Sequence, residues 1–143
     1  MPHLAALGVC FALASLPSAP PLFVPTAEFT LAWTHSVEKV RWEEDYKVEP
    51  SNNENGARLV ATKARIKGSA AGMEPPANAV LRDGWYEYVP PQTHPGTLRL
   101  TRSRYVPDYT WCIRGKCMPL SAIMPSDSNV TLLDACKSPK VSP

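Results

Sequence analysis

The clearest pattern in the sequence is an alternation of apolar and polar residues over 29–48. Successive side chains of a strand point to opposite faces, so this pattern predicts two antiparallel strands joined by a turn centred on Val37 and Glu38. The apolar face would consist of Phe29, Leu31, Trp33 and His35 from the first strand and Val40, Trp42, Glu44, Tyr46 and Val48 from the second. The turn predicts the cross-strand pairs Trp33–Trp42, Leu31–Glu44 and Phe29–Tyr46. Each aromatic pair would contribute about 0.2–1 kcal/mol.

Short strand-like segments continue along the rest of the chain, with turn residues at intervals of about eight to twelve residues. They cover residues 59–66, 79–81, 85–89, 98–104, 109–113, 116–120 and 130–133. In the first of them, the alternation predicts that Val60, Thr62, Ala64 and Ile66 point inward and Lys63, Arg65 and Lys67 point outward. A helical turn is expected near 121–124. The predicted fold is all-β, a small antiparallel sandwich or barrel of about seven to nine short strands.

The N-terminus carries an apolar run over residues 4–16 that is too short to span a bilayer but suits the core of a signal peptide. We therefore expect a signal peptide over 1–14, cleaved before Ser15, and a periplasmic or otherwise exported protein. An extended Pro-rich lead-in over 15–26, a single β domain over 27–137 and a tail over 138–143 would follow. No Lys or Arg precedes the apolar run, so retention of this segment is the alternative.

Length and charge narrow the possible functions further. A chain of 143 residues builds one domain with a small core, and its 16 prolines argue against long helices. The formal net charge is +2, without a dense Lys/Arg stripe interleaved with aromatic residues, so the sequence does not predict nucleic-acid binding.

Four cysteines provide candidate disulfides. If Cys10 leaves with a signal peptide, Cys112, Cys117 and Cys136 remain, and two of them should pair in an oxidising compartment. A two-residue turn at Arg114-Gly115 would bring Cys112 and Cys117 face to face at a non-hydrogen-bonded position, where Cα atoms lie about 4.5 Å apart. Pairing of Cys136 with either of them is the alternative. Each arrangement leaves one thiol unpaired.

Ionisable groups on the apolar hairpin face are the best candidates for a binding site. His35 and Glu44 would lie there as polar groups of a pocket, or else at half-exposed strand ends. Arg65 could receive a carboxylate, and Met73 and Glu74 lie in a Gly- and Pro-rich loop that could bind a ligand or plug the core. His35 cannot easily activate Ser36, because neighbouring strand residues point to opposite faces.

No nucleophile–base pair, phosphate-binding loop or set of metal ligands has workable spacing, so we expect no enzyme activity, no cofactor and no metal.

Five stretches are the most specific in the chain: Trp33-Thr-His-Ser-Val-Glu-Lys39, Trp42-Glu-Glu44, Gly68-Ser-Ala-Ala-Gly-Met-Glu-Pro-Pro76, Asp83-Gly-Trp85 and Trp111-Cys-Ile-Arg-Gly-Lys-Cys117. Together they resemble a family of small exported bacterial proteins of unassigned function. Members of that family are typically encoded beside, or fused to, the permease of TAXI-type tripartite ATP-independent periplasmic (TRAP) transporters. The resemblance covers most of the chain from Phe29 to Cys136, with Ala71 standing where the family usually has Gly.

The resemblance implies an accessory role beside a sodium-driven solute importer, through contact with the membrane or substrate-binding component of the transporter. It implies no catalytic or ligand residues. The alternative function is a small-ligand binding module for a carboxylate-type solute, with a pocket near His35, Glu44 and residues 72–76.

Overall fold

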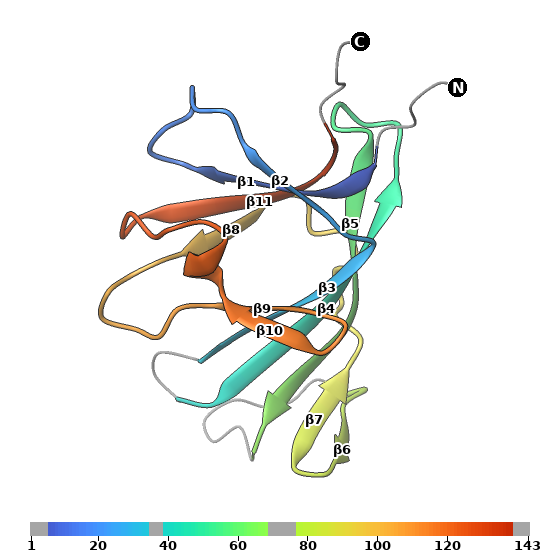
Figure 1. The fold of residues 1–143 in the computed structure, drawn as a ribbon. Coiled ribbons are helices and arrows are strands. Elements are labelled where there is room, and N and C mark those ends of the chain that lie inside the picture. The colour runs from blue at the N-terminus through green and yellow to red at the C-terminus, as the bar shows by residue number, and fades with distance from the viewer. Residues whose placement is uncertain (1–5, 35–38, 69–76, 139–143) are drawn as a thin grey trace.

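The computed structural model describes residues 6–34, 39–68 and 77–138. This part of the chain forms eleven strands and one short 3₁₀ helix (Figure 1). The strands are β1 (Leu7–Leu13), β2 (Leu22–Pro25), β3 (Glu28–Thr34), β4 (Arg41–Pro50), β5 (Ala57–Lys67), β6 (Val80–Arg82), β7 (Trp85–Tyr88), β8 (Leu98–Thr101), β9 (Thr110–Ile113), β10 (Lys116–Pro119) and β11 (Val130–Lys137), and the helix is η1 (Leu120–Ala122).

All strand pairs are antiparallel, and the strands form two sheets. Sheet A has the order β2-β1-β11-β8, and sheet B has the order β10-β9-β3-β4-β5-β7-β6. The predicted all-β sandwich is confirmed, with more strands than the seven to nine expected. The additional strands include β1 and β2, which come from the segments predicted to be a signal peptide and its lead-in.

Aromatic and aliphatic side chains fill the space between the sheets. Trp111 of β9 is 1% exposed. Its ring stacks on Phe29 of β3 with 4.5 Å between centroids, and it meets the edge of Phe11 from β1 at 5.4 Å. Strands from both sheets therefore contact one indole. Burial of large aromatic side chains from both layers stabilises a sandwich.

Strand β1 is an integral part of this core. Val9 and Phe11 are fully buried, β1 pairs with β11 and β2, and Cys10 forms a disulfide with Cys136. The segment predicted to be a signal peptide thus forms a strand in the full chain, because an apolar run of this length suits a strand buried on one face as well as a signal core. Its cleavage stays a prediction. The second disulfide, Cys112–Cys117, confirms the predicted hairpin pairing. The predicted unpaired thiol is wrong, because all four cysteines are bonded.

The central hairpin has the predicted register: Trp33 faces Trp42, Leu31 faces Glu44 and Phe29 faces Tyr46. The Phe29 and Tyr46 rings stack at 5.2 Å and the two indoles at 6.0 Å. The predicted turn residues Val37 and Glu38 lie outside the described residues.

Strand β5 departs from its predicted pattern at a bulge. Asp45 faces Lys63 and Tyr46 faces Ala61, so Thr62 is the extra residue between them. Ala64 and Ile66 point inward as predicted, but before the bulge Leu59 and Ala61 are the buried residues. The predicted inward positions of Val60 and Thr62 are wrong because an inserted residue reverses the faces of the strand that precedes it.

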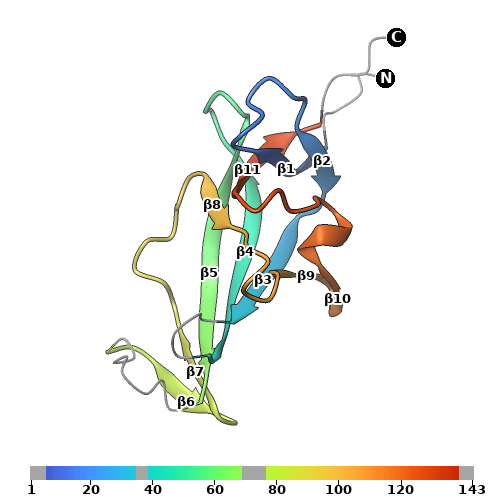
Figure 2. The same cartoon turned by 90° about the vertical axis from the view of Figure 1, so that its left-hand side faces the viewer.

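Sheet B extends beyond sheet A. The ten residues of β4 and eleven of β5 form long strands, and β7 and β6 lie past the end of sheet A (Figure 2). The half of sheet B that holds Phe29 and Tyr46 is covered by sheet A, whereas Trp33 and Trp42, at the other end of the hairpin, are only partly buried. The described residues include no helix with the length and apolar character needed to cross a bilayer.

Candidate functional site

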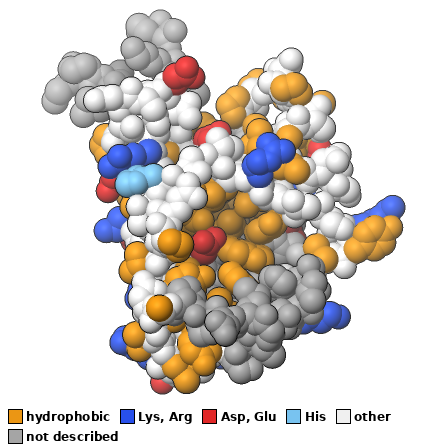
Figure 3. All heavy atoms as spheres, turned by 180° about the vertical axis from the view of Figure 1, so that it is seen from behind, with side chains coloured by type: hydrophobic (Ala, Val, Ile, Leu, Met, Phe, Trp, Pro, Cys, Tyr) orange, Lys and Arg blue, Asp and Glu red, His pale blue; other side chains and the backbone are white. Residues whose placement is uncertain are grey.

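A hollow lies where sheet A ends on the inner face of sheet B. It consists of two adjoining depressions of about 250 and 320 Å³ that share Trp33 and Tyr109. The first is lined by Leu31, Trp33, Glu44, Tyr46, Leu98, Arg99, Leu100 and Tyr109, and the second by Trp33, Thr34, Thr101, Ser103, Val106, Pro107 and Tyr109. We call this site the aromatic hollow. Hydrophobic side chains gather around a depression on this side of the molecule (Figure 3).

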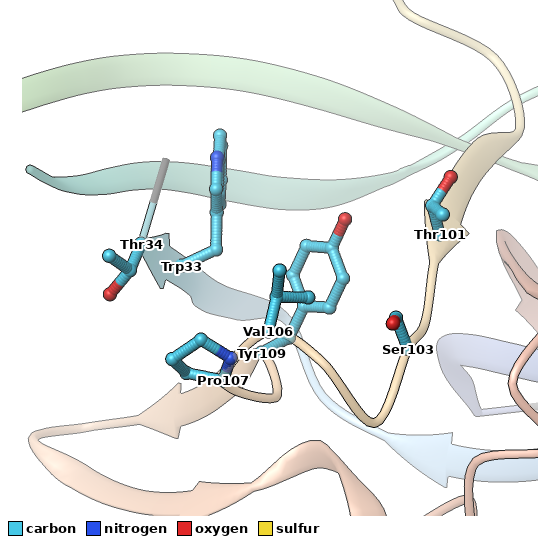
Figure 4. A pocket seen from close by; sticks show the side chains of 7 residues that line it. All are labelled: Trp33, Thr34, Thr101, Ser103, Val106, Pro107 and Tyr109. Atoms are coloured by element: carbon cyan, nitrogen blue, oxygen red, sulfur yellow. The ribbon is translucent and has the colours of Figure 1, made fainter. Parts of the chain in front are cut away.

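Three segments that are separate in the sequence, 31–34, 44–46 and 98–109, build the walls. Trp33 stands at the end of β3, Tyr109 occupies the middle, and Thr101 and Ser103 line the opposite side (Figure 4). The Trp33 and Tyr109 rings are 6.0 Å apart at a tilt of 49°. Alternation along β3 directs Trp33 inward, because Leu31 and Phe29 on the same face enter the core.

Glu44 is the acidic residue of the aromatic hollow. Its neighbours across the sheet are Leu31 on β3 and Ala64 on β5. Its Oε1 accepts a hydrogen bond of 3.1 Å from the Tyr46 hydroxyl. Burial raises the pKa of the Glu44 carboxyl above its ordinary value, and the Tyr46 hydroxyl only partly offsets this effect. Among the described residues, Glu44 forms no salt bridge.

The tyrosines near Glu44 respond to the same environment. Burial, followed by the negative charge of Glu44, raises the pKa of Tyr46 and of Tyr88 on β7. Burial also raises the pKa of Tyr109. These hydroxyls therefore stay protonated and keep their capacity to donate a hydrogen bond.

Arg65 lies on the opposite face of sheet B from Glu44. Its Nε donates to Glu43 at 2.7 Å, and its two terminal nitrogens donate to Asp45 at 2.9 and 3.0 Å. The hydrogen bonds that Arg65 donates to Asp45 raise the pKa of Arg65. Burial alone would raise the pKa values of Glu43 and Asp45, but their bonds to arginine hold both below the ordinary range. Arg65 is thus bound within a charged network, and Thr30 adds a further bond to Asp45.

Of the predicted site residues that the structure describes, Glu44 lies in the aromatic hollow and Arg65 does not. Arg65 is separated from it by the sheet, because residues 43, 44 and 45 of the paired strand alternate between faces. His35, Met73 and Glu74 lie outside the described residues.

Sequence reasoning missed the role of Tyr109 and of the segment before it. Arg102 holds the segment before Tyr109 in place, and its side chain is fully buried. It donates to both carboxylate oxygens of Asp108 at 3.1 and 3.2 Å, to the Met124 carbonyl at 2.8 Å and to the Thr131 hydroxyl at 3.0 Å. The sequence does not distinguish Arg102 from the other arginines, because the burial of Arg102 depends on β11 and residues 120–124, which are remote along the chain.

The described residues contain no group of three or more His, Cys, Asp or Glu side chains placed to hold a metal ion. The aromatic hollow can instead bind through apolar contact, through aromatic faces and through one carboxylate.

The fold and the hollow define a small disulfide-bonded β-sandwich with an open, aromatic-lined site. The chain belongs to the family described as "Domain of unknown function (DUF1850)", whose model matches residues 29–120. That match runs from the second residue of β3 past the end of β10 and includes the lining residues of the aromatic hollow. No curated protein and no solved structure matches the chain at a significant level.

Proposed function

We propose that this protein is an exported accessory protein that acts with a TAXI-type TRAP solute transporter, through direct contact with the membrane or substrate-binding component. Export is supported by the two disulfides, which persist in oxidising compartments. The link to a TRAP transporter is supported by the sequence motifs, which resemble those of proteins encoded beside such permeases.

The observation that carries the contact role is the half-open aromatic face of sheet B. Trp33, Trp42, Tyr86 and Tyr88 are only partly buried where the sheet continues beyond sheet A. The same end of the sheet includes exposed apolar residues on and beside its last strands, with Val80, Leu81 and Val89 each more than half exposed. Apolar surface that stays exposed in a small domain commonly marks a site of protein contact.

Two of the five motifs that carry the resemblance also meet at this face. Trp33 opens the first motif, and Trp42 and Glu44 begin and end the second. Both motifs supply lining residues of the aromatic hollow.

Binding of a small carboxylate is the second candidate, and the hollow favours it less. Its two depressions lie at or below the lower end of the roughly 300–1,000 Å³ usual for ligand pockets. Glu44 would repel a carboxylate, and Arg65, the expected partner for one, is bound to Glu43 and Asp45 on the other face.

A crosslinking pull-down tests the proposal. The tagged full chain is expressed in its own cells, and crosslinked partners are identified by mass spectrometry after detergent extraction. Recovery of a TRAP permease or its substrate-binding protein is expected. Thr101→Trp should lower this recovery about tenfold or more, because Thr101 is exposed and lines the hollow, so a large side chain there would fill it.

Arg104→Trp is the matched control, since Arg104 is exposed in the same segment but does not line the hollow. Recovery of neither transporter component from crosslinked cells would overturn the proposal. Equal losses with the two tryptophan variants would overturn the assignment of the contact to the hollow.

A further inference from the structure

We propose that the aromatic hollow binds an organic cation, an ammonium or guanidinium group carried on an apolar stem, with Glu44 as its counter-charge. The proposal rests on the proposed function only for the source of the cation, which is a Lys or Arg side chain of the partner in one case and a free solute in the other. The chemistry recognised is the same in both.

The three consecutive acids on β4 provide an internal comparison. Glu43 and Asp45 face outward, where Glu43 pairs with Arg41 and Arg65, and Asp45 pairs with Arg65. Glu44 faces inward between Leu31 and Ala64, and in the described part of the chain its bonded partner is the Tyr46 hydroxyl. Removal of a carboxylate from water without a cation is unfavourable. Glu43 and Asp45 have arginine partners, whereas among the described residues the charge of Glu44 has no cationic partner.

Glu44 retains capacity to bind a ligand. An ionised carboxylate offers about four acceptor positions, and the Tyr46 hydroxyl uses one of them. Glu44 also lines one depression of the hollow, so a ligand there can approach it. A charged donor placed in the hollow would form the stronger, charge-assisted type of hydrogen bond.

Aromatic rings surround the approach to this carboxylate. Trp33 and Tyr109 line both depressions, and Trp33 stacks on Trp42 with 6.0 Å between centroids. The negative face of an aromatic ring attracts a cation that lies within about 6 Å of the centroid, and Trp gives the strongest attraction. An apolar wall formed by Leu31, Leu98 and Leu100 would receive the stem of the ligand.

Above the titration range of Glu44, the neutral tyrosines that face it leave its negative charge unopposed, whereas Arg99 opposes a cation. Tyr46 and Tyr88 remain neutral because burial and Glu44 raise their pKa values. Tyr109 also remains neutral, and Arg99 on β8 contributes an exposed positive charge at the rim. Binding should therefore weaken as the pH falls through the pKa of Glu44. Removal of the Arg99 charge should strengthen binding.

The test uses the full chain and four probes of similar shape: n-butylguanidinium, n-butylammonium, neutral n-butanol and anionic butanoate. Binding is followed by tryptophan fluorescence and by calorimetry at pH 8. The two cations should bind and the neutral and anionic probes should bind much more weakly. Glu44→Gln should weaken cation binding about tenfold or more, as expected for a lost charge-assisted bond.

Glu49→Gln is the matched control, because Glu49 lies on the same strand outside the hollow and pairs with Arg58. Arg99→Gln should bind the cations more tightly than the wild type. Equal cation binding by the wild type and Glu44→Gln, or equal binding of butanol and the cations, would overturn the proposal. Thermal melting of each variant shows that the fold is retained.

A competition arm distinguishes the two sources. If butylguanidinium releases the crosslinkable transporter partner, the natural cation belongs to that partner. If the probe binds without releasing it, the natural cation is a free solute. Loss of probe binding would overturn the cation site while the pull-down still reports on the transporter role, so the two proposals fail separately.

Discussion

Arg102 should be among the most sensitive positions for stability. Its side chain is fully buried and makes four hydrogen bonds that join residues 102–109 to β11 and to the segment after η1. Substitution of Arg102 by Met keeps a long apolar stem and removes every donor. The change therefore separates loss of the charged network from loss of packing.

The magnitude follows from the groups that Arg102 leaves behind. Removal of one partner of a buried ion pair typically destabilises by about 3–5 kcal/mol. The lower part of this range applies to Asp108, because 27% of its side chain is exposed and it still accepts bonds from the backbone nitrogens of Tyr109 and Ser121. The fully buried Thr131 hydroxyl loses a donor, at about 1–3 kcal/mol.

We therefore expect Arg102→Met to lower the free energy of unfolding by about 4 kcal/mol and the melting temperature by roughly 10 °C, since about 2–4 °C corresponds to 1 kcal/mol in a chain of this size. Calorimetry and denaturant unfolding measure both values. Arg104→Met is the matched control, because Arg104 is exposed and its guanidinium lies over the ring of Tyr105, which is also exposed. A melting temperature of Arg102→Met within 2 °C of the Arg104→Met value would refute the reasoning (a margin of about 1 kcal/mol).

Three further changes test other parts of the structure. The folded state holds the Glu44 proton more tightly than the unfolded chain, so this group lowers stability as the pH rises above about 4.5. Glu44→Gln should therefore raise the melting temperature at pH 8 and change it little at pH 4. An equal shift of the melting temperature at both pH values would contradict this. The Cys10–Cys136 bond closes a separation of 126 residues and Cys112–Cys117 one of 5, so paired Cys→Ala changes should destabilise by about 5 and about 2 kcal/mol, in that order. In Gly8→Ala the new Cβ would meet the Val24 carbonyl and lie 2.9 Å from the Pro25 Cα; about 1–3 kcal/mol should be lost, and an unchanged melting temperature would argue against the β1–β2 pairing.

Local sequence rules predicted the hairpin well. The alternation from Phe29 to Val48 predicted which residues face each other, because a shift of one residue would have placed Trp33 and Trp42 on opposite faces of the sheet. The Arg114-Gly115 turn similarly placed Cys112 opposite Cys117. Both features depend on residues close together along the chain.

Features set by distant contacts were not predictable in this way. The composition of the apolar run at the N-terminus suits both a signal peptide and a buried strand. The strand in the structure depends on pairing with β11, which is distant in the sequence. The bulge at Thr62 has no Gly or Pro to mark it. The second wall of the aromatic hollow needs β8 and residues 103–109 to pack beside β3, so the sequence indicated Glu44 but neither Tyr109 nor the depth of the site.

The stability and binding of Glu44 are linked, and this linkage ties the candidate function to the fold. A charge that destabilises the folded state through burial becomes less unfavourable when a cation binds beside it, so ligand binding must lower the carboxyl pKa that burial raises. A cation that binds only the folded protein also raises the melting temperature by an amount set by its concentration and Kd. The increase produced by n-butylguanidinium should be larger at pH 8 than at pH 4 and should be lost in Glu44→Gln. The substitution that stabilises the free protein at pH 8 should therefore be the one that abolishes stabilisation by the ligand, a reversal that a purely structural role for Glu44 does not produce.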